Sequence, residues 1–202
     1  AVERLALCQV LVLDEFQAPG VTEALAGLER RNLIRLDESG SRIRISLTHP
    51  HYAAAVRDSL PRIRAISLLL EQADILEGLL QRDAAPAAGS DTYERGRSAA
   101  AELRVAIWRL DAGRTADPAM LLRAAELARQ AQDSRTAARL VEAAIAGGAY
   151  QAEIYMMHAE LMWALGRGAQ ALDSLANAEL AARSEPESQA MLVAIAARRA
   201  EV

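Results

Sequence analysis

Sliding the second half of the sequence over itself by a period of about 34 residues brings like residues together, and this repeat limits the possible folds more than any other feature. Three alanines of one segment fall on three of the next: Ala125, Ala137 and Ala144 on Ala159, Ala171 and Ala178. Larger residues coincide too: Leu121 with Tyr155, Leu127 with Leu161, Ala128 with Met162 and Val141 with Leu175. Such periods are typical of stacked helix pairs, which bury their apolar faces against one another. We therefore expect stacked helical hairpins.

The period and the alanine spacing resemble the tetratricopeptide repeat (TPR), a helix-turn-helix unit of about 34 residues. In that repeat, small residues stand where the two helices of a hairpin approach most closely. The resemblance implies units over about 118–151 and 152–185, with a third beginning at Pro186. Helices are predicted over 92–112, 118–131, 134–147, 151–165, 168–182 and 187–202. The alternative is an alanine-rich helical bundle in which the match is accidental.

The N-terminal part of the chain, up to Pro50, follows a different pattern. An apolar helix is expected over 1–13 and a second from Val21, with charged residues on its opposite face. From Ile34 the period changes to two, and the alternation resumes over Ile43–Leu47 after DESG, whose Gly40 suits a tight turn. Helices followed by a two-stranded hairpin are the minimal winged-helix pattern. The fold class expected is mainly α, a winged-helix-like module with a small β-hairpin followed by a TPR-like α-helical repeat array.

We divide the chain into a winged-helix-like module over 1–60, a linking helix and linker over 61–91, and the repeat region over 92–202. Pro50 and Pro61 suit the first turns of two further helices, and Thr48 or His49 suits an N-cap. The linker is the Ala-, Pro- and Gly-rich segment 82–91. The helix over 92–112 does not keep the repeat register, so it is expected to cap the array or link it to the first module.

The segment QVLVLDEF, Gln9 to Phe16, has the form of a Walker B strand, in which an Asp and a Glu follow apolar residues. A nucleotide hydrolase of that class also needs a P-loop with its lysine. All 23 basic residues of this chain are arginine. A P-loop is therefore excluded, and we expect this segment to be a buried helix that ends in two solvated acids.

Charge and composition exclude further classes of function. The net charge of −4 gives no basic footprint for nucleic acid. Arg35, Arg42 and Arg44 of the hairpin could contact phosphates, but residues 1–65 as a whole are nearly neutral, which favours a solvated or protein-facing hairpin. The apolar runs are too short for a membrane span, and the lone Cys8 suits a reducing cytosol. We expect a cytoplasmic protein without membrane contact.

Few residues suggest chemistry. His49 and His51 flank a proline at a helix start with no third ligand nearby, so no metal is expected and a capping role is favoured. Nothing in the sequence resembles a catalytic triad or a glycine-rich phosphate cradle, so no enzyme active site is expected. Aromatic and methionine side chains gather over 155–163; part of that helix faces the concave side of a repeat array, where a ligand or partner could bind. This candidate face comprises Tyr155, Met156, Met162 and Trp163.

The order of these elements resembles the middle of large bacterial LuxR-type regulators of the signal-transduction ATPase (STAND) class, similar to the maltose-regulon activator group. LTHPHY, Leu47 to Tyr52, matches that family's HPL(Y) segment after the wing. AIWRLDAG, Ala106 to Gly113, matches the A(L)WRLDAG segment before the repeats. LERRNLIRLDESG is similar to the segment ahead of the hairpin, with Asn32 where Gly is frequent. In that family a P-loop ATPase comes first and a LuxR-type helix-turn-helix comes last.

The resemblance implies a non-enzymatic regulatory fragment of a signal-dependent transcriptional regulator. Its repeats would bind a small-molecule inducer or a protein partner, and its winged-helix module would pack on the ATPase domain of the same chain. His49 would sense the bound nucleotide. ATP or ADP is expected only for the full-length protein, as is DNA binding through the C-terminal helix-turn-helix; this fragment would hold no cofactor. The chain opens AVERLA without an initiator Met, which also suggests a piece of a longer protein.

Two other hypotheses remain open. One is a stand-alone TPR adaptor that binds a peptide or protein partner without a nucleotide switch. The other is a DNA-binding winged helix with a helical dimerisation arm. The regulator, too, could form homo-oligomers.

Overall fold

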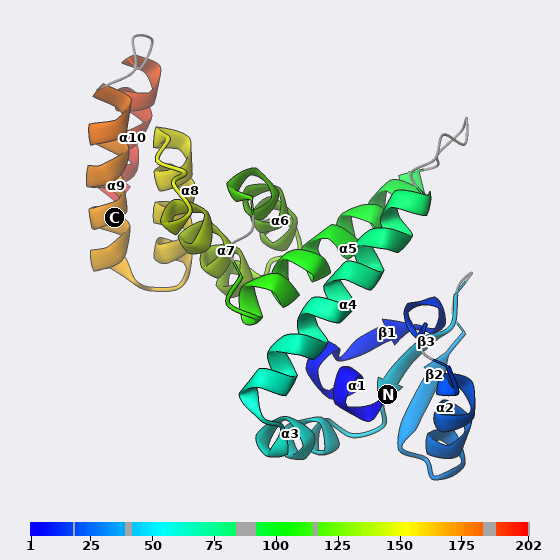
Figure 1. Ribbon diagram of the computed structural model, residues 1–202. Helices are drawn as coiled ribbons and strands as arrows, with labels where there is room; N and C mark the ends of the chain where they lie inside the picture. The colour runs from blue at the N-terminus through cyan, green and yellow to red at the C-terminus, as the bar shows by residue number, and fades with distance from the viewer. Residues whose placement is uncertain (18, 39–41, 84–91, 115–116, 184–188, 202) are drawn as a thin grey trace. The chain divides into compact units, whose positions relative to one another are not determined.

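The computed structural model describes residues 1–17, 19–38, 42–83, 92–114, 117–183 and 189–201. The fold is mainly helical with a small antiparallel sheet of three strands (Figure 1). The chain divides into two compact units. The first comprises Ala1–Glu94 with Asp111–Arg114, and the second comprises Arg95–Leu110 with Thr115–Val202. Among the described residues, no helix has both the length and the apolar character that crossing a membrane requires.

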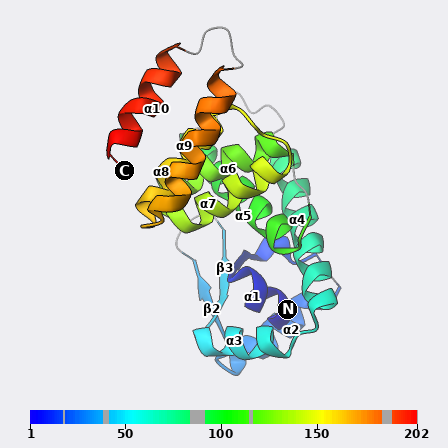
Figure 2. The same ribbon diagram turned by 90° about the vertical axis from the view of Figure 1, so that its left-hand side faces the viewer.

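In the first unit, one short helix leads into the sheet and another precedes its hairpin. The elements are α1 (Val2–Cys8), β1 (Val10–Val12), the 3-10 helix η1 (Leu13–Glu15), α2 (Val21–Arg30), β2 (Ile34–Asp37) and β3 (Arg44–Leu47). The sheet order is β1-β3-β2, so the hairpin's second strand is central (Figure 2). Leu11 lies opposite Ile45 in the register, and both are buried. This pair anchors the sheet to the core beneath it.

The helix predicted over 1–13 is wrong in its second half. The chain leaves α1 at Gln9, where φ is 64°, and continues as strand β1. Pairing with β3 gives the backbone of Val10, Leu11 and Val12 partners outside their own segment, and this tertiary context outweighs the local helical pattern. The two acids also differ from the prediction: Asp14 is exposed, but Glu15 is only 1% exposed.

The predicted hairpin is confirmed. Ile34 lies opposite Leu47, and Leu36 lies opposite Ile45, in an antiparallel register. Because side chains alternate along a strand, Ile34 and Ile45 point into the core while Arg35 and Arg44 are exposed. The predicted turn at Gly40 lies outside the described residues.

Two further helices complete the first unit: α3 (Pro50–Ser59) and α4 (Arg62–Asp83). His49 occupies the N-cap position of α3, with extended backbone angles and Pro50 in the first turn, as predicted, but its side chain makes no capping hydrogen bond, so the favoured capping role is not borne out. Both helices pack against α1. The sequence assigned residues 61–91 to a linking segment, but α4 belongs to the same compact unit as the sheet. Most of the predicted linker, residues 84–91, lies outside the described residues.

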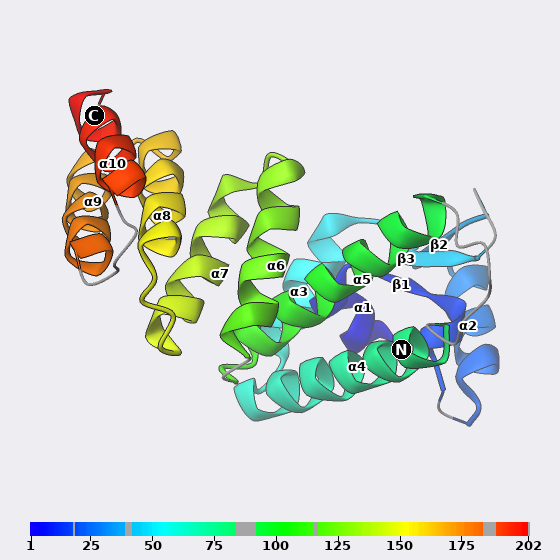
Figure 3. The same ribbon diagram turned by 90° about the horizontal axis from the view of Figure 1, so that it is seen from above.

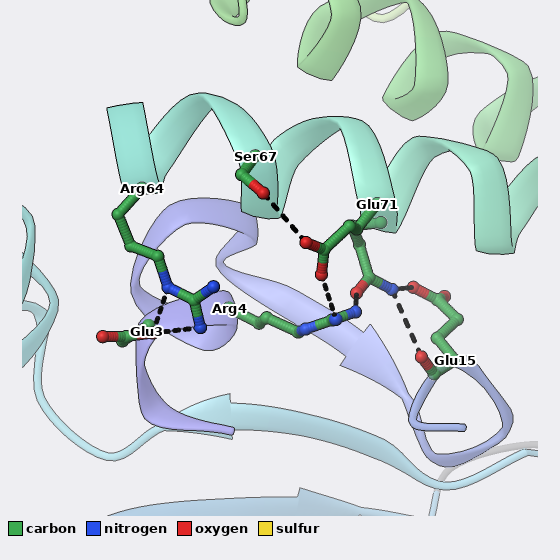
Figure 4. Close-up of polar contacts among 7 residues, drawn as sticks. Glu3, Arg4, Glu15, Arg64, Ser67 and Glu71 are labelled. Carbon is green, nitrogen blue, oxygen red and sulfur yellow. Dashed lines mark hydrogen bonds and ion pairs between the residues drawn. The ribbon is translucent and has the colours of Figure 1, made fainter. Parts of the chain in front are cut away.

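A polar network joins α4 to α1 and η1 (Figure 4). The Arg4 guanidinium donates to Gln72 Oε1 at 2.8 Å and to Glu71 Oε2 at 2.8 Å. Gln72 Nε2 in turn donates to the Glu15 carboxylate at 3.2 Å. Glu15 and Gln72 are both buried, so this chain of hydrogen bonds satisfies groups that water does not reach.

The second unit is helical in its described residues, as predicted. Its elements are α5 (Thr92–Asp111, of which Arg95–Leu110 belongs to this unit), α6 (Pro118–Gln130), α7 (Ser134–Ala146), α8 (Ala152–Ala164), α9 (Gly168–Arg183) and α10 (Gln189–Glu201). The helices α6 and α7 form one hairpin and α8 and α9 a second, while α10 packs on α9 (Figure 3). Pro186, where a third unit was predicted to begin, lies outside the described residues.

The two hairpins repeat with the same period in their backbone as in their sequence. Helix α6 begins at Pro118 and α8 at Ala152, and both have 13 residues. Asp133 N donates to Ala128 O at 2.9 Å, and at the equivalent place in the second hairpin Arg167 N donates to Met162 O at 2.8 Å. The turn residues before these donors, Gln132 and Gly166, both have positive φ. The sequence repeat is therefore also a structural one.

The alanines that revealed the repeat are all at helix contacts. Each of the six is at most 1% exposed: Ala125, Ala137, Ala144, Ala159, Ala171 and Ala178. Ala125, Ala137 and Ala144 share one core with Ala106 of α5 and Leu161 of α8. Ala159 and Ala178 lie in a second core with Ile195 of α10. A methyl group at these positions lets the helices approach closely, and the larger residues beside them fill the remaining space.

Candidate functional site

A hollow of about 460 Å³ opens in the second unit beside the loop between α7 and α8. Its described lining comes from that loop, from α8 and from α9, and consists of Gly148, Tyr150, Gln151, Tyr155, Asn177, Leu180 and Ala181. None of these side chains carries a charge. Tyr150 and Leu180 are 60% and 65% exposed, so apolar surface is offered to solvent there. Tyr155 is the one residue of the predicted ligand face that lines this hollow.

The chain builds this hollow by ending α7 sharply. Gly148 has φ of 103°, and the Ala149 amide donates back to Ala144 O at 3.0 Å. Ala149 is buried, and Tyr150 is therefore turned outward. Gln151 is the N-cap of α8 but makes no side-chain capping hydrogen bond. Gln151 belongs to the lining of the hollow.

The matching positions of the first hairpin hold different residues. Tyr155, Asn177 and Leu180 correspond to Leu121, Ala143 and Ala146, which lie one repeat period earlier. In the first hairpin the end of α7 lies close to the start of α6: a Cβ added to Gly147 would lie 3.2 Å from Pro118 Cγ. The second hairpin therefore keeps the alanines of the scaffold but changes the residues around the hollow.

The other residues of the predicted ligand face do not form one surface. Met156 is half-buried and packs against the second core together with Tyr155. Met162 is fully buried in the first core, so its side chain is not available to a ligand. Trp163 is 44% exposed, two helical turns beyond Tyr155. The four residues therefore do not form one face, because Met162 packs in the first core and Met156 packs against the second.

Charged residues are paired on α6 and between α8 and α10. On α6, Arg129 Nη2 donates to Glu126 Oε1 at 2.7 Å. On α8, Glu160 accepts from Arg198 Nη2 of α10 at 2.7 Å. The hydrogen bonds from Arg129 lower the pKa of Glu126. The hydrogen bond to Glu126, and the charge of Glu160 less strongly, raise the pKa of Arg129. Charges of alternating sign thus run from α6 to α10.

One polar cluster was not found from the sequence. His158 Nδ1 lies 2.7 Å from Ser174 Oγ, and His158 Nε2 lies 3.6 Å from Glu142 Oε1. These residues are on α8, α9 and α7, far enough apart along the chain that no short motif reveals them. Aligning the two repeats could, however, have drawn attention to these residues. The residues one repeat period before His158 and Ser174 are Ala124 and Leu140, so a polar pair replaces a buried apolar one.

This Glu–His–Ser cluster does not present a nucleophile to solvent, because Ser174 is only 4% exposed. The Ser174 hydroxyl contacts both Gln170 O and His158 Nδ1, each at 2.7 Å. The cluster links three helices.

His49, predicted to sense a nucleotide by resemblance, is exposed at the start of α3 in the first unit. Its ring contacts that of Tyr52 edge-on, with centroids 5.5 Å apart and planes at 85°. His51 is also exposed. In the part of the chain that the structure describes, no three His, Cys, Asp or Glu side chains gather as metal ligands would.

Two of the three predicted hairpin arginines, Arg42 and Arg44, are paired with acids. Arg42 Nε lies 3.5 Å from Asp14 Oδ2, and Arg44 Nη2 lies 3.1 Å from Asp37 Oδ2. The exposed face of α2, beside the hairpin, presents Glu23 and Glu29 along with Arg30. This surface lacks the net positive charge on which phosphate binding depends.

Comparisons with protein-family models, with curated proteins and with solved structures found no match to this chain.

Proposed function

We propose that this chain is the winged-helix and TPR-like sensor region of a bacterial LuxR-type STAND-class transcriptional regulator, located in the cytoplasm. The observation that carries the proposal is the register of the second unit. Two helical hairpins share one repeat period in their helix starts, turn geometry and buried alanines. A stack of this kind presents a large surface on a rigid frame, which suits a receiver of signals.

The topology of the first unit supports the winged-helix assignment. The order helix, strand, short helix, helix, hairpin, with the strands arranged β1-β3-β2, is that expected of a winged helix. The paired arginines of the hairpin and the acidic residues of α2 argue against DNA as its target. In the proposal this module packs on the ATPase domain of the same protein, and His49, exposed at the N-cap of α3, contacts the nucleotide side of that domain.

The hollow beside Tyr155 is where an inducer or a segment of a partner protein would bind. Its lining offers aromatic faces from Tyr150 and Tyr155 and carboxamides from Gln151 and Asn177. Such groups hydrogen-bond and stack on uncharged molecules, so the ligand would carry no net charge at this place. The ligand would shift the regulator between states only if it binds one of them more tightly.

A stand-alone adaptor remains the second candidate, and the exposed Trp163 on α8 favours it. An adaptor would bind a peptide there without any nucleotide switch. The two candidates differ in what surrounds this segment in its gene. The regulator requires a P-loop ATPase before it and a helix-turn-helix after it.

The test is made with the full-length protein encoded by the gene. If the regulator proposal holds, the protein retains ADP or ATP, and His49→Ala weakens that retention at least tenfold, whereas His51→Ala does not. This chain alone should not bind duplex DNA at low salt. A full-length protein without nucleotide, or steeply salt-dependent DNA binding by this chain, would refute the proposal.

A further inference from the structure

Strand β2 is an outer strand of the sheet in the first unit (Figure 2). On one side it pairs with β3, and within the described residues no strand lies along its other side. An edge of this kind offers unpaired N–H and C=O groups to a strand that can lie beside it. The residues of β2 that direct these groups outward decide which strand fits.

The hydrogen bonds of the sheet show that the backbone of Leu36 is directed outward. In an antiparallel ladder, hydrogen-bonded and non-hydrogen-bonded residue pairs alternate. Thr48 N donates to Leu33 O at 3.0 Å, so the hydrogen-bonded pairs of the β2–β3 ladder continue at Arg35 and at Asp37. The N–H and C=O groups of Leu36, between them, therefore point away from β3. Among the described residues, no backbone hydrogen bond outside the ladders involves Leu36.

The side chains of β2 divide between two faces of the sheet. Ile34 and Leu36 lie on the core side, the first buried and the second half-buried. Arg35 and Asp37 are exposed on the opposite side. Asp37 Oδ2 lies 3.1 Å from Arg44 Nη2 of β3, and both of these side chains are half-exposed. Because a carboxylate accepts several hydrogen bonds, Asp37 can bind a second guanidinium.

A second copy of β2 fits this edge, because the edge is complementary to itself. With the two strands antiparallel and Leu36 opposite its own copy, the outward N–H group of each strand meets the outward C=O group of the other. The same register puts Arg35 of each copy opposite Asp37 of the other. These pairs lie where opposed side chains approach most closely, and opposite charges there stabilise the pairing. The two half-buried Leu36 side chains meet on the core side.

The backbone and the charges disfavour the neighbouring registers. Shifting the second strand by one residue brings to the edge backbone groups that are already bonded to β3. Shifting it by two residues puts Arg35 opposite Arg35 of the other copy, or Asp37 opposite Asp37, and like charges directly opposite are destabilising. The register with Leu36 at its centre remains, and it has the twofold symmetry that is usual in dimers.

We propose that this chain self-associates through β2, so that the sheets of two copies join into one continuous sheet. Two strands of four residues bury far less area than the about 1,600 Å² of a standard interface. The association is therefore weak, with a dissociation constant on the order of 0.1 mM. It forms where the protein is concentrated or where another contact already holds two copies together. This inference does not depend on the identity of the regulator.

The first test exchanges the charges and measures association of the whole chain by sedimentation equilibrium, at concentrations up to about 1 mM. Arg35→Glu leaves acids at both charged positions of β2, and Asp37→Arg leaves arginines at both. Each variant alone should therefore raise the dissociation constant about tenfold or more. An equimolar mixture of the two should associate about as tightly as the wild type, because every opposed pair is again of opposite sign.

Arg62→Glu, at an exposed position of α4, makes the same change of charge away from the sheet and should behave as the wild type. A wild-type chain that stays monomeric at about 1 mM would overturn the proposal. So would well-folded Arg35→Glu and Asp37→Arg variants whose mixture associates no better than either variant alone.

Hydrogen exchange in the wild-type chain supplies a second readout that needs no variant. The Leu36 amide should exchange about threefold more slowly at about 1 mM than at about 0.05 mM, because the second copy covers it. The Arg35 amide, which bonds β3 in the monomer and the dimer alike, should be protected equally at both concentrations. Exchange of the Leu36 amide that does not change with concentration would refute the inference even if the chain dimerised, since the contact would then lie elsewhere.

Discussion

Gln132 and Gly166 occupy the same position in two successive helical hairpins, and both have positive φ, 61° and 73°. Each ends the turn between the two helices of its hairpin. In the first turn a side chain tolerates the left-handed region; in the second, glycine adopts it without steric cost. The hairpin therefore requires a positive φ at this position, and two different residue types adopt it.

Gly166→Ala should destabilise the second hairpin by about 1 kcal/mol, because a Cβ strains a left-handed residue. Gln132→Gly makes the opposite change at the equivalent position. It should alter the free energy of unfolding little, since relief of backbone strain in the folded state offsets the added freedom of the unfolded chain. Gly27→Ala, in helix α2 with open space around it, should instead stabilise by about 0.5–1 kcal/mol. Urea unfolding measures all three; a neutral Gly166→Ala would contradict the argument.

Ala171→Leu should cost about 1–3 kcal/mol, because Ala171 is fully buried in the first core and added methylene groups in a packed core force its neighbours to move. The matched control is Ala169→Leu on the same helix. Ala169 is exposed, so its change should lie within about 0.5 kcal/mol of zero. The free energies of unfolding in urea give the comparison. If both variants lose the same amount, close approach at the repeat alanines is not the cause.

Asp133→Ala should destabilise the first hairpin by about 1 kcal/mol. The Asp133 carboxylate caps α7 by accepting from the Thr136 amide at 3.1 Å. Asp133→Asn, which keeps a capping oxygen, should recover most of the loss. Thermal unfolding followed by circular dichroism is the measurement, and an alanine variant as stable as the wild type would show that the cap contributes nothing.

The same cap gives a pH dependence with a definite sign. Hydrogen bonds donated by the Thr136 side chain and amide lower the pKa of Asp133 below its ordinary value of 3.8. The ionised form is thus favoured in the folded state. Its stabilising effect is complete above the unfolded-state pKa and is lost as the pH falls through the folded-state value. Asp133→Asn should therefore lose less stability than the wild type in this acid range; an equal loss would contradict the assignment.

Gln72→Leu should destabilise the first unit by about 1–3 kcal/mol, because the buried Glu15 carboxylate loses the amide that donates to it at 3.2 Å. Glu15→Leu combined with Gln72→Leu should cost less than the sum of the two single changes, since neither buried group is then left unpaired. The control is Glu71→Gln, whose partner bond with Arg4 is exposed and should matter little. Strict additivity in a double-mutant cycle would argue against the network.

The helices of the second unit follow from the sequence, because each position in them is decided by near neighbours. The spacing of Ala125, Ala137 and Ala144, and the turn residues between them, recur in the next repeat, and the predicted helix ends lie close to those of the structure. The hairpin at Ile34–Leu47 was equally readable from its alternation. These elements can be predicted from the sequence because apolar residues recur along it with the period of a helix or of a strand.

Tertiary structure alone decided the rest. Val10–Val12 became a strand because β3, distant along the chain, offers its edge, and Glu15 is buried because Gln72 of α4 meets it. The sequence likewise did not indicate that Met162 would be hidden while Tyr155, on the same helix, lines a hollow. The meeting of Glu142, His158 and Ser174 depends on how three helices pack. Local propensity sets most of the elements; long-range packing decides the others, such as β1, and selects the side chains that the elements bring together.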